Sequence, residues 1–281
     1  MPGMKRPTEI QYSFTYRKES YDERDFLYQP LTLVSRESLL TTPSVVDWTS
    51  EMSPVKDQMR LGSCVGFAVV AMKEWQEQKE HAEEVASGKF DHRTEKYYDL
   101  SEAWVYWMCK KIDEWPGTEG TSFRYAMKVL RKLGVPSEKA WPYDDVVKGS
   151  PEKWAHLVAR WSLIDSYWRI TSLEELKDAL KSGPAILGIG VYDEIFSVGD
   201  DGIIEDPKYP QFCYGGHAIC VVGYDDNKKL IKFKNSWSNK WGKKGYGYIS
   251  YYYVRNFAWD AWTCRDLSVT REMLAGARTL L

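Results

Sequence analysis

The stretch that decides the fold is QMRLGSCVGFAVV, residues 58–70, in which a cysteine lies between small residues where an apolar pattern begins. From this cysteine onward the apolar residues recur at the spacing of an α-helix, at Phe67, Ala68, Ala71, Met72 and Trp75. A thiol at a helix N-terminus lies near the positive end of the helix dipole, which favours the thiolate. Most free cysteines are inert core residues. Because Gly62 and Gly66 leave room for another molecule beside the sulfur, we interpret Cys64 as a nucleophile.

The composition excludes several classes of protein. A chain of 281 residues can form one domain or two closely packed lobes. Its net charge of −2 points to neither nucleic acid nor an anionic membrane, and no charge-free segment is long enough to span a bilayer. The start of the chain lacks the apolar run of a secretory signal. Five cysteines without framework spacing predict reduced thiols and, most simply, a cytoplasmic protein.

The predicted elements change character along the chain. Helical patterns follow Cys64 and recur at residues 100–113, 121–134 and 172–183, the second with Ser101 as cap and the last with a capping box from Ser172 to Glu175. Short β-branched and aromatic runs then occur, at residues 184–192, 217–226, 229–237 and 246–251. A helical first half followed by a β-rich second half predicts an α+β protein of two lobes.

A thiol nucleophile needs a base that can also protonate a leaving group near neutral pH, and histidine fits best. Three of the four histidines lie where a solvated or structural role is expected, namely His81, His92 and His156. His217 differs, because two glycines precede it in CYGGHAICVVGYDD and a predicted strand follows. We therefore pair His217 with Cys64.

The imidazole has to be held in one orientation by an acceptor or an amide. Asn235 is the candidate, since it ends a predicted strand in KFKNSWSNKWGKKGYGYI, beside tryptophans able to shield a His–Asn hydrogen bond. Gln58 lies six residues before Cys64, so its amide is a candidate oxyanion donor together with the Cys64 N–H.

These blocks resemble the papain-like cysteine peptidases. PVKDQMRLGSCVGFA resembles the family's segment from glutamine to nucleophile, GGHAICVVGYDD its histidine strand, and KNSWSNKWGKKGYGYI its asparagine segment, in the family's order. Weaker similarity covers roughly residues 43–255, and the local sequence is closer to that of the disulfide-poor microbial members of the family. The resemblance implies a papain-like α+β fold, with a helical left lobe, an antiparallel β right lobe and the active-site cleft between them.

The resemblance also implies a role for each matching residue. Cys64 is expected to be the nucleophile, His217 the general base and acid, Asn235 the orienting residue, and Gln58 part of the oxyanion hole. A further set is implied to contact substrate: Gly62, Gly120, Phe123, Gly216, Ala218, Trp237 and Trp241. Within it, the two tryptophans are expected on the leaving-group side, and the backbones of Gly120 and Gly216 are expected to pair with an extended substrate. Phe123 and Ala218 are expected near the pocket for the second residue before the cut.

The sequence departs from the family's pattern in three places. Leu61 stands where the family has a disulfide-forming cysteine, which agrees with reduced thiols. Val65 replaces an aromatic residue after the nucleophile, and Ser238 stands where glycine is common after NSW.

The expected domain organisation has four parts. Residues 1–42 form an N-terminal arm or a short propeptide-like segment, and residues 43–150 form the left lobe with the nucleophile helix. Residues 151–265 form the right lobe with the histidine and the asparagine, and residues 266–281 form a C-terminal tail helix.

Three other functions remain open from the sequence. Cys213, His217, Cys220 and Cys264 could bind structural zinc, although His217 and Cys220 should point to opposite faces of a strand. The same acyl-enzyme could serve a transpeptidase or an amidase. A non-catalytic peptide-binding module is the third alternative.

The function that we predict is hydrolysis of peptide bonds through a thioester acyl-enzyme, with no cofactor and no metal, on a peptide or protein substrate. The thiol and the imidazole are expected to form a thiolate–imidazolium pair around neutral pH. The sequence leaves open the cleavage-site preference, endo- against exopeptidase action, the natural substrate, the removal of residues 1–42, the role of the tail and the oligomeric state.

Overall fold

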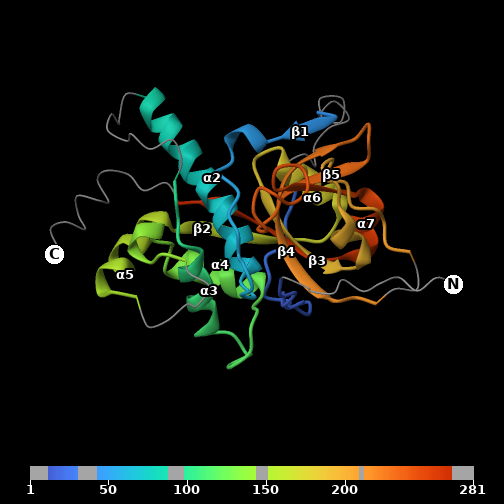
Figure 1. Cartoon of the computed structure of the whole chain (residues 1–281). Coiled ribbons are helices and arrows are strands. Elements are labelled where there is room, and N and C mark those ends of the chain that lie inside the picture. Colours follow the sequence, from blue (N-terminus) through green and yellow to red (C-terminus); the bar gives the residue numbers. More distant parts are fainter. Residues whose placement is uncertain (1–11, 31–42, 88–97, 144–150, 209–211, 268–281) are drawn as a thin grey trace.

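The computed structural model describes residues 12–30, 43–87, 98–143, 151–208 and 212–267 (Figure 1). Its helices are α2 (Cys64–Ala86), α3 (Glu102–Lys110), α4 (Phe123–Lys132), α5 (Lys153–Ala159), α6 (Leu173–Leu180) and α7 (Tyr251–Phe257). Its strands are β1 (Val45–Asp47), β2 (Ile164–Ile170), β3 (Ala185–Val191), β4 (Gly215–Asp225), β5 (Leu230–Lys234), β6 (Tyr246–Ser250) and β7 (Ala258–Asp266). Within the described ranges, no helix combines the length and the apolar content that crossing a membrane requires.

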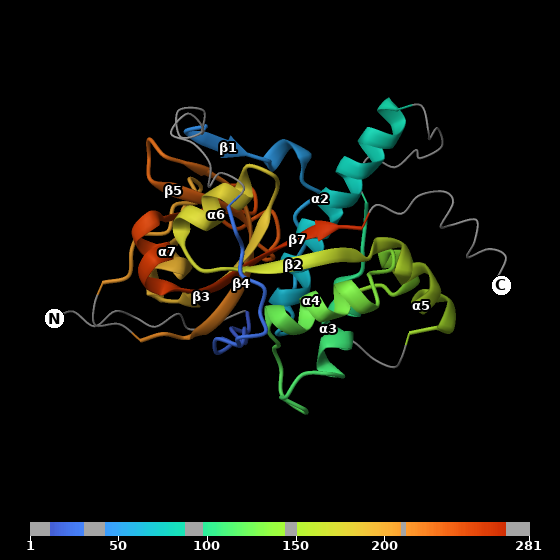
Figure 2. The same ribbon diagram turned by 180° about the vertical axis from the view of Figure 1, so that it is seen from behind.

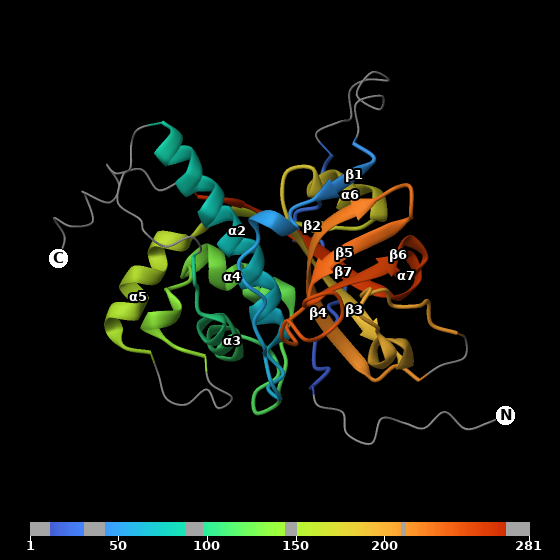
Figure 3. The ribbon, with the colours of Figure 1, turned by 45° about the horizontal axis from the view of Figure 1, so that its top comes forward.

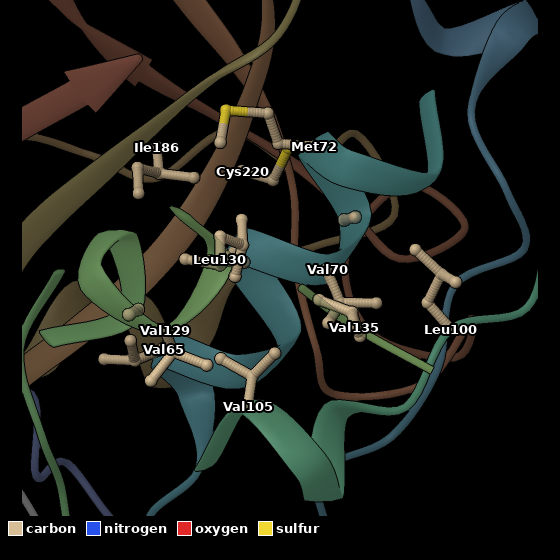
Figure 4. Packing of buried hydrophobic residues seen from close by; sticks show 14 of the residues in the cluster. Val65, Val70, Met72, Leu100, Val105, Val129, Leu130, Val135, Ile186 and Cys220 are labelled. Carbon is tan, nitrogen blue, oxygen red and sulfur yellow. The ribbon is translucent and has the colours of Figure 1, made fainter. Parts of the chain in front are cut away.

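The elements divide into a helical lobe and a β-rich lobe, which confirms the α+β prediction. Figure 3 shows α3, α4 and α5 on one side of α2, and the strands β4, β5 and β6 on the other. One buried cluster joins the helices to the adjoining face of the sheet, and Figure 4 shows side chains from α2, α3, α4, β3 and β4 within it. A second cluster lies between the far face of the sheet, α6 and α7.

The sheet is antiparallel, with strand order β2-β7-β3-β4-β5-β6 and β1 added against β4. Its two faces follow from the alternation of side chains along each strand. Cys220, Ile186 and Trp262 lie opposite one another on β4, β3 and β7, and all three belong to the cluster with α2. The next row, Ile219, Leu187 and Ala261, belongs to the cluster beneath α6 and α7. The central strands are therefore buried on both faces.

Local sequence explains where the helices begin. Ser101 caps α3, because its hydroxyl accepts a hydrogen bond from the Trp104 N–H at 3.1 Å. Ser172 caps α6 in the same way through the Glu175 N–H. The reciprocal bond of the predicted capping box is displaced by one residue, since Glu175 accepts from the Thr171 N–H rather than from that of Ser172.

The structure differs from the sequence analysis at three points. β2, α7 and β7 were not predicted. Helix α5 follows the lobe boundary expected at residue 150, yet Figure 3 shows it beside α3 and α4, and its Ala155 and Ala159 belong to the cluster that joins the helices to the sheet. The predicted tail helix falls outside the described residues, apart from its first two positions, and Asp266 there ends β7.

The described part of the N-terminal arm lies on the body of the protein. Figure 2 shows this blue segment passing β4 and β2 between the lobes. Thr15 forms a parallel bridge with Gly216 of β4, and Leu27 forms another with Arg169 of β2. The arm thus contacts the sheet where the two lobes meet.

Candidate active site

Cys64 is the first residue of α2, as the sequence predicts, and its side chain is fully buried. Helix α2 packs against β4. The backbone N–H groups of Ala218, Val65 and Cys64 itself face the sulfur and favour its thiolate. Because Ala218 follows His217 directly on β4, the nucleophile candidate and the histidine candidate meet at the junction of the lobes.

His217 is held by the residue expected to orient it. Its Nε2 and the Asn235 Oδ1 form a hydrogen bond of 2.8 Å. The Trp237 ring stacks on the imidazole, with 4.5 Å between centroids, and Trp241 packs edge-on against Trp237 at 5.4 Å. The His217 Nδ1 has no hydrogen-bond partner among the described residues. The shielded bond therefore fixes the ring and leaves its second nitrogen available to a thiol proton.

Gln58 is buried between the helix start and the asparagine segment. Its Nε2 donates to the Leu61 carbonyl at 3.0 Å, and its Oε1 accepts from the Ser236 hydroxyl at 2.6 Å. An amide nitrogen carries two N–H groups, so one remains after the bond to Leu61. These contacts fix the Gln58 side chain in one orientation within the site.

The N-terminal arm covers the site in an extended conformation. The Thr15 hydroxyl donates to the Gly62 carbonyl at 3.2 Å, and the Tyr16 N–H donates to the Gly216 carbonyl at 3.0 Å. The Tyr16 N–H is also among the groups that face the Cys64 sulfur. At the leaving-group end the Tyr12 ring stacks on Trp237, with 4.8 Å between centroids. The arm therefore occupies the place expected for a peptide.

Three glycines from the expected substrate set make this close approach possible. A Cβ at Gly120 would lie 1.9 Å from the Thr15 carbonyl oxygen, and one at Gly62 would lie 2.1 Å from the Thr15 hydroxyl. A Cβ at Gly216 would lie 2.6 Å from the Tyr16 carbonyl oxygen. All three distances are shorter than van der Waals contact, so a side chain at Gly120 or Gly216 would displace the backbone of the arm, and one at Gly62 would displace the Thr15 side chain. Gly120 also requires glycine for its positive φ of 82°.

Tyr16 fills the pocket for which Phe123 and Ala218 were the expected lining. Its ring lies 4.7 Å from the Phe123 ring and 6.0 Å from the Trp259 ring, centroid to centroid. Its hydroxyl donates to the carboxyl group of Asp260. Ala218 lies in this region through its pairing with Gly188, whose Cα borders the Tyr16 ring.

Burial determines the protonation of the covered pair. Burial raises the pKa of the Cys64 thiol to about 11, and it lowers the pKa of His217 to about 4 against the opposing effect of the Asn235 bond. Both shifts favour the uncharged forms of the thiol and the imidazole while the arm covers them, and the thiolate–imidazolium pair of the uncovered site stays a prediction. The cause is the loss of water from both charged forms beneath the arm.

The zinc alternative finds no support in the positions of its candidates. Cys220 packs on the side of the sheet that faces α2, whereas His217 stacks on Trp237 of the second cluster. Among the described residues, no group of three His, Cys, Asp or Glu side chains is placed to hold a metal ion. Of the other histidines in the described ranges, His156 packs edge-on against Trp104 at 4.7 Å, and His81 lies within α2.

The sequence analysis missed Tyr16 and Asp260. A signal for the first exists in YSFTY, residues 12–16, where aromatic residues alternate with small polar ones as in a strand buried on one face. Asp260 has no such signal in the sequence, because an isolated aspartate in AWDAW is expected to be solvent-exposed. Its burial becomes apparent only from the pairing of its strand.

A buried cysteine at a helix start lies against the strand whose histidine an asparagine holds, which agrees with a cysteine-type peptidase. Residues 42–258 match the model of the papain family cysteine proteases. The chain belongs to this family, whose members hydrolyse peptide bonds.

Individual relatives agree with this assignment. An uncharacterized peptidase C1-like protein of Acanthamoeba polyphaga mimivirus is 30% identical over 92% of this chain and 88% of its own length. Procathepsin L of Felis catus is 30% identical over 73% of this chain, which spans 59% of that longer protein. Among solved structures, xylellain, a cysteine protease from Xylella fastidiosa, has a TM-score of 0.77 and 27% identity over 93% of this chain and all of its own. Digestive procathepsin L 3 of Tenebrio molitor has a TM-score of 0.61 and 25% identity, over 86% of this chain and 76% of its own.

Proposed function

We propose that the protein hydrolyses peptide bonds through a thioester acyl-enzyme formed on Cys64. The observation that carries this proposal is the hydrogen bond from His217 to Asn235 beneath Trp237, beside a cysteine at the first position of α2. The deprotonated sulfur attacks the scissile carbonyl, and the Gln58 amide and the Cys64 N–H stabilise the oxyanion. His217 protonates the departing amine, which leaves the thioester.

Hydrolysis then proceeds by the reverse proton transfers. His217, neutral once the amine has gone, takes a proton from water as the water attacks the thioester. The collapse of this intermediate releases the carboxylic acid and returns the thiolate with its imidazolium. A transpeptidase or an amidase would use the same residues with another acceptor or substrate, and competition between water and added amines for the acyl-enzyme distinguishes these activities.

We also propose that the arm residues 12–29 exclude peptides from the site until they move. The support is that the arm lies against Gly62, Gly120 and Gly216, the glycines expected to contact substrate, and bonds the Gly216 carbonyl through a backbone N–H of its own. Burial beneath the arm raises the pKa of Cys64 and lowers that of His217, and both directions agree with a resting form. In this form, access of the substrate to the site limits activity.

All five cysteines lie within the described ranges, and each is a free thiol. We propose on this basis that the protein works in a reducing compartment such as the cytoplasm, where thiols persist. Cell fractionation with an antibody against the native chain tests this directly.

The mechanism is tested by limited labelling with an epoxysuccinyl peptide at mildly acidic pH, where ordinary thiols are protonated and slow. Intact mass and peptide mapping are expected to show one adduct, on Cys64, that is absent from Cys64→Ala and lost in His217→Ala. An adduct that forms only once the arm is loosened supports both the mechanism and the covering role of the arm. No adduct on Cys64 in any form of the chain would overturn the mechanism in favour of a binding module.

A further inference from the structure

The hydroxyl of Tyr143 contacts two residues of the nucleophile segment. It donates to the Gln58 carbonyl at 2.7 Å, and its oxygen lies 2.8 Å from the Ser63 Oγ. A carbonyl cannot donate, so the single hydroxyl proton of Tyr143 goes to Gln58, and Ser63 donates to Tyr143. One hydroxyl group thus joins the residue that carries the candidate amide donor to the residue before the nucleophile.

The Tyr143 ring is held by contacts that do not involve its hydroxyl. Phe67 of α2 packs edge-on against it, with 4.9 Å between centroids, and the Tyr143 N–H donates to the carboxyl group of Glu138. Both partners lie outside the loop that carries Gln58. The ring therefore offers this loop a fixed point, and Tyr143→Phe removes the hydroxyl while keeping the ring contacts.

Gln58 is fully buried and is anchored at four polar groups. Its backbone N–H donates to the Ser236 carbonyl at 2.8 Å, and its backbone carbonyl accepts from Tyr143. Its side chain bonds the Leu61 carbonyl and the Ser236 hydroxyl. These bonds leave one side-chain N–H for an oxyanion. Without the Tyr143 hydroxyl the backbone of Gln58 is anchored on one side only, and this N–H loses part of its fixed direction.

Ser63 does not cap its helix. It stands at the N-cap of α2, where a serine hydroxyl ordinarily accepts from the second or third N–H of the helix, but its side chain makes no such bond. The hydroxyl turns to Tyr143 instead. The second N–H of α2 belongs to Val65 and faces the Cys64 sulfur. Tyr143 thereby keeps the Ser63 hydroxyl away from an N–H that favours the thiolate.

We propose that Tyr143 is a positioning residue of the oxyanion hole, whose hydroxyl aims the Gln58 amide and the Cys64 N–H at the same oxygen. The Cys64 N–H belongs to the peptide group that begins at the Ser63 carbonyl, so an anchor on Ser63 also fixes the direction of that N–H. This proposal rests on the proposed peptidase function and adds a residue to its machinery.

The test measures kcat and KM of Tyr143→Phe with a fluorogenic peptide amide. We expect kcat to fall about tenfold with KM changed less than about twofold, because the alignment matters most once the oxyanion forms. In a Gln58→Ala background the same substitution should lower kcat by only about twofold to threefold, since the main donor that it aligns is already gone. A tyrosine with a merely structural role would lower kcat by the same factor in both backgrounds.

Tyr224→Phe is the matched control. The Tyr224 hydroxyl also donates to a backbone carbonyl, that of Pro43 at 2.8 Å, where β4 pairs with β1 and away from the nucleophile. Both tyrosine variants should lower the melting temperature to a similar extent, and Tyr224→Phe should leave kcat unchanged.

Epoxysuccinyl labelling of Cys64 separates the oxyanion hole from the thiol. Opening of an epoxide passes through no tetrahedral carbonyl intermediate, so Tyr143→Phe should be labelled at the wild-type rate. A labelling rate that falls with kcat would place the effect on the thiol and the imidazole and overturn the proposal. If Tyr143→Phe does not fold, Ser63→Ala replaces it, and a fewfold loss of kcat at unchanged labelling is expected.

The remaining outcomes distinguish the proposal from the function on which it rests. An unchanged kcat in the folded variant, or an equal loss in the two backgrounds, overturns the role of Tyr143 and leaves the peptidase function intact as long as Cys64 is labelled. Absence of both cleavage and labelling in the wild-type chain and in Asp25→Asn overturns the peptidase function itself, and the role of Tyr143 with it.

Discussion

The backbone N–H of Tyr16 donates to the carbonyl of Gly216 at 3.0 Å, one residue before His217. The same N–H faces the Cys64 sulfur, so one amide of the arm contacts both the strand that carries His217 and the helix start that carries Cys64. An arm in this position competes with any peptide for the glycine-lined path between the lobes.

Asp25 anchors the arm, and its loss is expected to open the site. It accepts hydrogen bonds from Arg124 of α4 at 2.9 and 2.7 Å and from Arg169 of β2 at 3.1 Å. We expect Asp25→Asn to raise the rate of peptide cleavage by the full-length chain about tenfold, because bonds between charged groups are weakened while the catalytic residues are untouched. Initial rates with a fluorogenic peptide measure the change.

Asp22 provides the matched control for this prediction. Its hydrogen bonds and its ion pair are to the exposed Arg24, within the arm itself. Asp22→Asn removes the same charge without detaching the arm from the body, so the cleavage rate should stay at that of the wild-type chain. Equal activation by both substitutions would mean that the net charge, rather than the anchor, controls access.

Docking of the arm is expected to depend on pH through His217. Burial beneath the docked arm lowers the pKa of His217 from 6.5 to about 4. Between these pH values the imidazole is therefore neutral when the arm is docked and protonated when the arm has moved away. The contribution of His217 to docking is thus present above pH 6.5 and is lost as the pH falls through about 4. Glu19 has the opposite effect on docking, because burial raises the pKa of its carboxyl group from 4.5 to about 7. As the pH falls through this range, protonation of Glu19 stabilises the docked arm.

Glu19→Gln should therefore make the docking equilibrium of the arm fall more steeply as the pH falls. For a single proton the docking constant changes by at most about tenfold per pH unit. Amide exchange of residues 12–17, followed by mass spectrometry and corrected for intrinsic rates, measures docking. Addition of His217→Ala to Glu19→Gln should remove the steep response between pH 6.5 and 4. If the response persists in that double variant, another group controls the acid opening.

The positions of the candidate catalytic residues could be predicted from the sequence because each lies in a short motif with a clear local structure. Cys64 begins a helix with a clear apolar period, His217 lies in a strand that is buried on both faces, and Asn235 follows a strand in which lysines alternate with buried apolar residues. β3 and β4 were predictable from their continuous apolar runs, and β5 from its alternating pattern.

β2, β7 and the covering arm could not be predicted, because they depend on one another. β2 carries Arg169 and β7 carries Asp260, both buried here although charged residues usually indicate exposure. Arg169 is neutralised by Asp25 of the arm, and Asp260 is bonded by Tyr16 of the arm. These contacts join residues more than a hundred positions apart, which a local pattern does not report.

Gln58→Ala is expected to lower kcat by roughly a hundredfold if its amide stabilises the oxyanion. The substitution also leaves the Ser236 hydroxyl and the Leu61 carbonyl without their partner, so some loss of stability should accompany it. Ser236→Ala separates the two effects, because it breaks the bond to Gln58 Oε1 and leaves the amide N–H groups in place. We expect this control to lower the melting temperature while kcat changes only a fewfold, and a near-native kcat in Gln58→Ala would show that another donor serves the oxyanion.

Ser238 has a backbone conformation that favours glycine, the residue common after the NSW motif. Replacement of Ser238 by glycine is therefore expected to stabilise the fold. Its φ of 64° lies in the left-handed region, where a side chain on Cβ costs about 1–2 kcal/mol. Ser238→Gly removes that strain and keeps the bond from its N–H to the Lys56 carbonyl at 3.1 Å, while the greater freedom of glycine in the unfolded chain offsets part of the gain.

We therefore expect about 0.5–1 kcal/mol of added stability and, for a chain of 281 residues, a melting temperature higher by about 1–2 °C, measured by calorimetry. Ser238→Ala is the control, since it keeps the strained φ and removes only the hydroxyl that accepts from the Lys240 N–H at 3.3 Å. This variant should melt at or slightly below the wild-type temperature. Stabilisation by alanine as well as by glycine would locate the effect in the hydroxyl group, and the backbone strain at this position would then be negligible.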